Sequence, residues 1–225
     1  MDARKQLVVV LPGIGGSVLA GPGPGPAPAS GDRRRILWDA GFASLLRLRT
    51  SAHRLSLAET PETRPVGLIR SHAVVPGWSV VRGYERLLAR LSRLPGARLD
   101  EGDPEARVED ANIAAFPYDF RLGIEPAAHA LAADVHRRLE RLGWDGEPNR
   151  VIVIAHSMGG LVARYWLGPL GGRDACRALV TLGTPALVAS ARHPPLTSPA
   201  GAFAYPSGAS TSTRPSPWES SIARR

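Results

Sequence analysis

The chain has 225 residues, which is enough for one domain with a sizeable core. Its composition is 44% apolar, which excludes wholesale disorder, and its single cysteine, Cys176, excludes an internal disulfide and a cysteine-rich zinc module. The net charge of +8 is the difference between 28 basic and 20 acidic residues, and Lys5 is the one lysine among the basic residues. These residues are scattered rather than clustered, so we expect no nucleic-acid partner.

The N-terminal segment shares some features with a secretory signal, because Arg4 and Lys5 precede an apolar run at 7–11. The pair Pro12-Gly13 ends that run before it reaches the roughly 7 to 15 apolar residues of a signal core. No stretch of the sequence approaches the ~20 apolar residues of a membrane span. We therefore expect a soluble, cytoplasmic protein.

Apolar runs rich in β-branched residues predict strands that are buried on both faces of a sheet. These runs lie at 7–11, 151–154 and 179–182, and a short strand candidate lies at 112–116. Helical spacing predicts one helix from Tyr84 through Leu94 to a Pro95-Gly96 stop, and another from Pro126 to Gly143. Alternating strands and helices imply right-handed crossovers. The fold class expected is α/β, with a mainly parallel sheet and helices on both faces.

Two segments differ from this alternation. Residues 21–32 read GPGPGPAPASGD, where proline removes donors and glycine adds backbone entropy, so they predict a flexible insertion. With the apolar segment 36–49, they form a cap-like insertion at about 21–75. After Pro185 the chain is rich in Pro, Ser, Ala and Arg without any period, and we expect 186–225 to be a disordered tail. The expected domain is 1–185.

The pentapeptide AHSMG at 155–159 is the most informative motif for chemistry, because a predicted strand runs through it directly into a predicted helix. This is the pattern of a nucleophile elbow with alanine in place of the first glycine. The sharp turn strains the serine backbone, so the residues two before and two after must be small, as Ala155 and Gly159 are. Ser157 is thus the predicted nucleophile, and the N–H of Met158 at the helix start is a predicted oxyanion donor.

A second oxyanion donor is expected from the glycine-rich loop 12–17 after the first strand, where the N–H of Ile14 would join that of Met158. Two other glycine-rich motifs fit this loop less well. A phosphate-binding P-loop needs a lysine where Gly16 stands, and a dinucleotide fingerprint needs a glycine where Val18 stands. Both are disfavoured, so we expect no cofactor and no metal.

Four motifs occur in a characteristic order: LPGIGGS at 11–17, AAFPYDFR at 114–121, IAHSMGGLVARYWL at 154–167 and LVTLGTP at 179–185. Together they resemble the lecithin:cholesterol acyltransferase-like family of α/β-hydrolases. The resemblance implies an α/β-hydrolase fold acting on a lipid or other acyl ester, with Ser157 passing the acyl group to an alcohol or to water. It also implies membrane-surface contact through the cap.

Three further residues belong to regions that resemble this family. Trp38 lies in the cap-like region, where it is a candidate for substrate contact, although packing within the cap is the favoured role. Asp119 and Arg121 match a Tyr-Asp-Trp-Arg signature in which Phe120 replaces the tryptophan. We interpret Asp119 and Arg121 as an ion pair with a structural role.

A serine nucleophile also needs a carboxylate and a histidine, which follow the serine in this fold. After Ser157 the chain offers only Asp174, Glu219 and His193. A helix of ~11 residues would carry Asp174 about 16 Å to the wrong end of the sheet, and His193 lies in the predicted tail. His156 adjoins the nucleophile, but neighbouring side chains at such a turn diverge. The sequence therefore predicts a triad without its acid and base.

The family pattern and the composition both change immediately after Pro185, as a reading-frame shift would produce. We therefore expect a hydrolase fold that is incomplete at its C-terminus. Two functions follow. The first is a lipid O-acyltransferase or lipase/esterase with an acyl-serine intermediate at Ser157. The second is a catalytically incomplete fragment that at most binds a lipid or a partner. The oligomeric state is left open.

Overall fold

The computed structural model describes residues 6–21, 35–41, 44, 55–58, 62–70, 72–75, 78–81, 83–104 and 106–185. The predicted flexible insertion at 21–32 lies almost entirely outside these residues, and the predicted tail at 186–225 lies wholly outside them. Both expectations stay predictions, as does the frame shift after Pro185.

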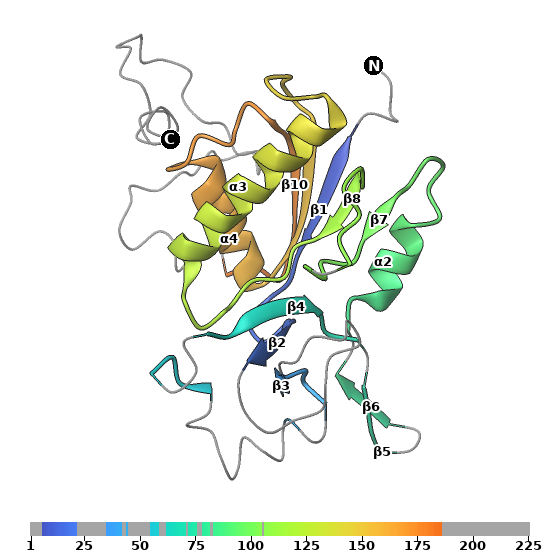
Figure 1. Cartoon of the computed structure of the whole chain (residues 1–225), viewed down its shortest axis with the longest axis vertical. Helices are drawn as coiled ribbons and strands as arrows, with labels where there is room; N and C mark the ends of the chain where they lie inside the picture. Colours follow the sequence, from blue (N-terminus) through green and yellow to red (C-terminus); the bar gives the residue numbers. More distant parts are fainter. Residues whose placement is uncertain are drawn as a thin grey trace, which may run out of the picture. The chain divides into compact units, whose positions relative to one another are not determined.

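A five-stranded parallel sheet forms the centre of the domain, with the strand order β10-β9-β1-β8-β7 (Figure 1). Its strands are β1 (Leu7–Leu11), β7 (Leu99–Asp100), β8 (Ile113–Ala115), β9 (Val151–His156) and β10 (Cys176–Leu182). The longest register joins β1 to β9 and runs from Leu7 opposite Val151 to Leu11 opposite Ala155. Because the strands are parallel, their carboxyl ends lie at one edge of the sheet.

Three described helices cover this sheet: α2 (Glu85–Leu91), α3 (Ile124–Leu142) and α4 (Met158–Leu167). Alternate residues of β1 point to opposite faces, as the period of a strand requires. Leu7, Val9 and Leu11 join the core with α3 and α4, whereas Val10 joins Leu88 of α2 on the other face. The sheet thus lies between α3 and α4 on one side and α2 on the other, which confirms the expected α/β architecture (Figure 1).

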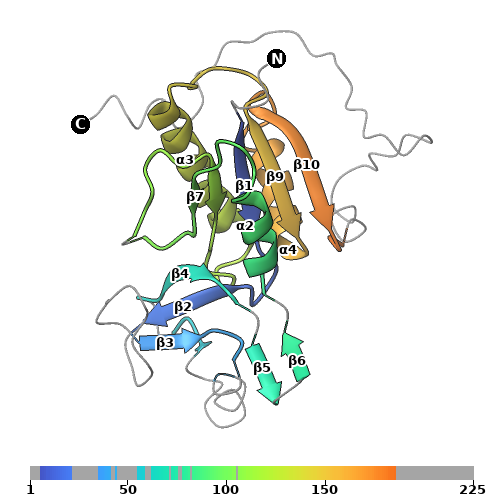
Figure 2. The same cartoon turned by 90° about the vertical axis from the view of Figure 1, so that its right-hand side faces the viewer.

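Smaller antiparallel units lie within and beside the segment in which a cap-like insertion is expected. Three strands, β2 (Ser17–Gly21), β3 (Arg35–Trp38) and β4 (Arg64–Leu68), form a sheet of order β3-β2-β4. A hairpin follows, made of β5 (His72–Val75) and β6 (Trp78–Val81) (Figure 2). The apolar segment 36–49 therefore begins within a strand. The role of these units as a cap stays a prediction.

Two predicted elements differ in detail from the structure. The helix predicted to reach Leu94 ends at Leu91, because the chain tightens into turns in which Leu94 N–H donates to Leu91. The strand predicted at 179–182 is not buried on both faces. Val180 and Leu182 are 46% and 48% exposed. They lie on the face that α2 covers at Val10, but β10 is at the edge of the described sheet, outside the cluster around α2 (Figure 2). The spacing of apolar residues in the sequence indicated neither the early end of α2 nor the exposure of β10.

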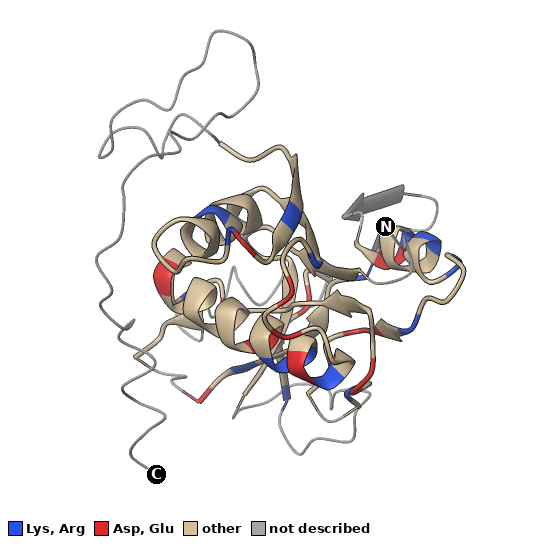
Figure 3. Cartoon of the chain, turned by 90° about the horizontal axis from the view of Figure 1, so that it is seen from above, with Lys and Arg blue, Asp and Glu red and all other residues tan. Residues whose placement is uncertain are grey.

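The core face of α3 also carries two charged residues that the apolar pattern did not indicate. Arg138 donates from Nε to Asp134 at 2.8 Å and from a terminal nitrogen to Asp100 of β7 at 2.7 Å. All three side chains are buried. Acidic and basic residues lie close together along α3 (Figure 3). This network ties α3 to the edge strand β7, and its members satisfy one another in place of water.

No helix in the described part of the chain has both the length and the apolar content needed to cross a membrane.

Candidate active site

Ser157 lies in the turn between β9 and α4, with backbone angles φ 49° and ψ −119°. A positive φ is strained for a residue with a side chain and persists only where surrounding contacts hold it. The contacts are present here. The N–H of Ser157 donates to the carbonyl of Leu182 at 2.8 Å, and its carbonyl accepts from Gly160 N–H and from the Thr184 hydroxyl, both at 3.0 Å. The backbone therefore has the geometry of a nucleophile elbow.

The small residues after the serine are required by close approach of the backbone. A Cβ on Gly159 would lie 2.5 Å from the carbonyl oxygen of Pro12 and 3.0 Å from Cβ of Leu11. A Cβ on Gly160 would collide with the side chain of Thr184. Gly159 thus lets the start of α4 rest directly against the end of β1, as expected for this motif, and Gly160 lets it approach Thr184 after β10.

The loop 12–17 passes beside the elbow and is held from several sides. Tyr118 donates from its hydroxyl to the Pro12 carbonyl at 2.8 Å and from its N–H to the Ser17 hydroxyl at 3.0 Å. Trp38 donates from Nε1 to the Gly15 carbonyl at 2.7 Å. Burial raises the pKa of the Tyr118 hydroxyl far above its ordinary value, so this group stays protonated and remains a donor.

The two predicted oxyanion donors belong to this loop and to the elbow. Met158 is the first residue of α4, and the first N–H groups of a helix have no partner within it. Ile14 lies at the exposed tip of the glycine loop, where its side chain is 69% exposed. Gly16 N–H donates to the Gly13 carbonyl at 2.9 Å and closes the turn around Ile14. Their roles as donors stay predictions.

One contact at this site was missed from the sequence. The hydroxyl of Tyr84, just before α2, lies 2.8 Å from Nδ1 of His156 and accepts a hydrogen bond from Gly13 N–H at 2.9 Å. Burial raises the pKa of the Tyr84 hydroxyl, and the Gly13 N–H opposes that shift. No local signal could have revealed the contact, because the three residues are far apart in the chain.

Asp174, the first carboxylate after Ser157 in the sequence, lies at the opposite end of the sheet from Ser157. The carbonyl of Asp174 accepts from Asn149 N–H at 2.8 Å, two residues before β9 begins, whereas Ser157 follows the end of β9. The prediction that Asp174 does not orient a catalytic histidine agrees with this position. His193 and Glu219 lie outside the described residues.

The structural roles expected for three other residues agree with their contacts. Asp119 and Arg121 form a buried ion pair of 2.7 Å. Trp38 makes an edge contact with the Phe120 ring at a centroid distance of 6.4 Å, besides its bond to Gly15. The tryptophan is therefore a packing residue, and lipid contact by it stays a prediction.

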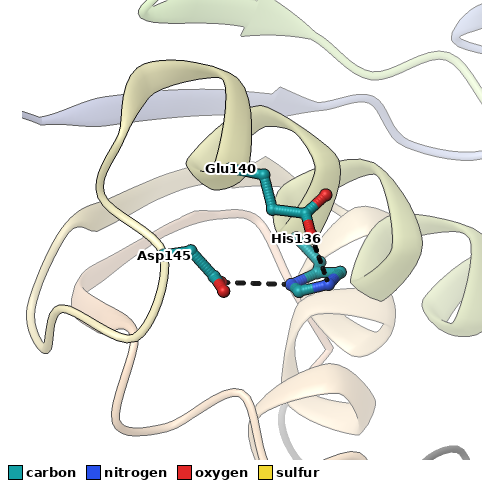
Figure 4. Close-up of side chains that lie close together, drawn as sticks. All are labelled: His136, Glu140 and Asp145. Atoms are coloured by element: carbon teal, nitrogen blue, oxygen red, sulfur yellow. Dashed lines mark ion pairs between the residues drawn. The ribbon is translucent and has the colours of Figure 1, made fainter.

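One surface group resembles a metal site by proximity. His136, Glu140 and Asp145 offer ligand atoms within 4.8 Å of one another, and all three are exposed (Figure 4). However, Glu140 lies 3.4 Å from Nε2 of the imidazole and Asp145 lies 3.2 Å from Nδ1. Each ring nitrogen thus faces a carboxylate of its own. The arrangement is that of an imidazole flanked by two acids.

Comparison with known proteins gives one family match. Residues 136–197 match the family described as "PGAP1-like alpha/beta domain". The matched segment contains β9, the elbow with Ser157, α4 and β10. A search of curated proteins found no match. The match supports a hydrolase-type α/β fold, and the more specific resemblance to the lecithin:cholesterol acyltransferase-like family is not confirmed by it.

Proposed function

We propose that this domain catalyses acyl transfer from an ester through an acyl-serine intermediate at Ser157, as a lipid O-acyltransferase or a lipase/esterase. The observation that carries the proposal is the backbone of Ser157, which is strained at φ 49° between a buried parallel strand and a helix. Strain of this kind in a residue with a nucleophilic side chain is typical of catalytic serines at the end of a parallel strand. The hydrolase-type fold supports the same reaction class.

In this reaction the Ser157 oxygen attacks the ester carbonyl, and the serine proton passes to a base. The carbonyl oxygen becomes an oxyanion, which two backbone N–H groups stabilise. Within the glycine loop, the N–H of Gly13 and that of Gly16 already have acceptors. This favours Ile14 as the loop donor, together with Met158 at the start of α4. Collapse of the intermediate releases the alcohol, and water or another alcohol then removes the acyl group from the serine.

The acyl-ester substrate class comes from this chemistry, and its lipid character comes from the family resemblance. Ile14 presents an apolar side chain to solvent beside the proposed oxyanion hole. An apolar group there suits the hydrocarbon part of an acyl chain better than a charged substrate. His193 is the one histidine after Ser157 in the sequence, and its place in the predicted tail disfavours it as the base.

The second candidate function is binding of a lipid or a partner without turnover. The observation that favours it is the position of Asp174, the one carboxylate between Ser157 and Pro185, at the opposite end of β9. A serine without a base and an orienting acid keeps only the contributions of the oxyanion hole and of substrate binding, about 10³ to 10⁴ over water.

The experiment that tests the proposal combines covalent labelling with turnover. The purified chain is treated with a fluorophosphonate, and its hydrolysis of p-nitrophenyl butyrate is followed. We expect label on Ser157 and weak ester hydrolysis, both abolished in Ser157→Ala and both retained in Ser92→Ala, which changes an exposed serine. Absence of Ser157-dependent labelling would overturn acyl transfer and favour binding without turnover. Strong turnover would make His193→Ala the next test.

A further inference from the structure

The hydroxyl of Tyr84 joins the glycine loop to the residue before the proposed nucleophile. Its oxygen accepts the N–H of Gly13 at 2.9 Å and lies 2.8 Å from Nδ1 of His156. The phenol and imidazole rings also meet edge to face, with centroids 6.0 Å apart. Tyr84 therefore links a loop after β1 with the end of β9, from a position just before α2.

The glycine loop approaches both this hydroxyl and the imidazole closely. A Cβ on Gly13 would lie 2.9 Å from both Nδ1 of His156 and Cβ of Ser157, and a Cβ on Gly16 would lie 3.0 Å from the Tyr84 oxygen. The glycine loop, the imidazole and the phenol thus fit together without room for a side chain on the loop. The Tyr84 hydroxyl is thus in contact with both the loop and the residue before Ser157.

We propose that Tyr84 is a positioning residue, whose hydroxyl bridges Gly13 and His156 and so sets the spacing between the Ile14 and Met158 N–H groups. The inference rests on the proposed acyl transfer at Ser157. It assigns Tyr84 no contact with substrate.

The physical reason is the geometry that an oxyanion hole requires. Two N–H groups stabilise one oxygen only when both lie within about 2.7 to 3.1 Å of its position in the transition state. Here one donor belongs to the loop 12–17 and the other to α4, so their spacing depends on contacts between the two. The Tyr84 bridge is such a contact, and it also engages the N–H next to that of Ile14. Its loss would weaken binding of the transition state more than binding of the ester.

The two ends of the bridge can be separated by substitution. Tyr84→Phe removes the hydroxyl and keeps the ring. His156→Asn places an amide where Nδ1 stands and preserves a hydrogen-bonding group, whereas His156→Leu removes it. Tyr165→Phe is the matched control, because its hydroxyl bonds to Glu125 on α3 rather than to the loop.

The test measures kcat and KM for p-nitrophenyl butyrate, the rate of fluorophosphonate labelling at Ser157, and the Tm of each variant. We expect Tyr84→Phe and His156→Leu to lower kcat and the labelling rate about 10-fold or more, with KM within about twofold, since misplaced donors fail chiefly in the transition state. His156→Asn should retain most of the rate, and Tyr165→Phe all of it.

Three results would overturn the inference. Labelling of Tyr84→Phe at the wild-type rate, with none in Ser157→Ala, would remove the positioning role and leave acyl transfer standing. Equal losses in His156→Asn and His156→Leu would show that the imidazole acts in another way. Absence of Ser157-dependent labelling in the wild type would remove the proposed function and this inference with it. If Tyr84→Phe fails to fold, the comparison of His156→Asn with His156→Leu tests the positioning role instead.

Discussion

Thr184 donates a hydrogen bond from its hydroxyl to the carbonyl oxygen of Ser157 at 3.0 Å. The threonine comes two residues after β10, and its side chain lies where a Cβ on Gly160 would be. The turn after β10 therefore stabilises the turn after β9 at Ser157, the residue with the strained backbone. Ser157 N–H also donates to Leu182 at 2.8 Å, so both backbone polar groups of the serine are engaged from this neighbouring segment.

Thr184→Val removes the hydroxyl and keeps the shape of the side chain. We expect the free energy of unfolding to fall by about 1 kcal/mol, because the Ser157 carbonyl retains its bond from Gly160 N–H and is not left unsatisfied. Urea denaturation measures the change. Thr181→Val is the control, because Thr181 is exposed on β10. Equal losses in the two variants would contradict a specific role for the Thr184 hydroxyl.

Gly159→Ala tests the close approach of α4 to the end of β1. Alanine favours a helix interior over glycine by roughly 1 kcal/mol, yet its Cβ would lie 2.5 Å from the Pro12 carbonyl. We expect a net destabilisation of about 2 kcal/mol from overpacking. Gly168→Ala, where the nearest atom would be 3.4 Å away and φ is −91°, should be close to neutral in thermal unfolding. A stabilised Gly159→Ala variant would refute the argument.

Arg138→Met removes the cation shared by two buried carboxylates: Asp100 loses its ion pair, whereas Asp134 keeps those with Arg137 and Arg107. We expect a loss of roughly 3 to 5 kcal/mol, because a buried charge that loses its partner keeps its desolvation cost. Arg141→Met removes an exposed arginine on the same helix, 3.6 Å from Glu109, and should change stability by less than about 1 kcal/mol. Guanidinium denaturation compares them, and similar midpoints would be evidence against the network as a stabilising element.

Val180→Lys tests the exposed edge strand. An apolar strand with unpaired backbone groups is a template for association between chains, and a lysine on such an edge opposes it. We expect less light scattering and a smaller oligomeric fraction in size-exclusion chromatography than for the unchanged chain. Leu94→Lys replaces a residue that is 52% exposed but lies in the turns after α2 rather than in a strand. An equal improvement in both variants would point to general solubility rather than to β10.

Several elements were predictable because their signals are local. The runs at 7–11 and 151–154 combine apolar and β-branched residues, which suit a strand buried between helices, and both are strands of the central sheet. Gly143 was the expected stop of α3, and it adopts φ 69°, which glycine reaches without strain. The turn at Ser157 was predictable for the same reason, since its small neighbours and flanking elements are contiguous in the chain.

The remaining features depend on residues that only folding brings together. The bridge from Tyr84 to Gly13 and His156, the bond from Thr184 to the serine carbonyl and the position of β10 at the sheet edge carry no periodic signal in the sequence. By itself the sequence determined β1, β8, β9 and β10, the three described helices and the elbow, because backbone propensity and side-chain spacing act over a few residues. The strands β2 to β7 were not predicted from it. Only the tertiary structure decided which polar groups meet, because a hydrogen bond depends on distance in space rather than separation along the chain.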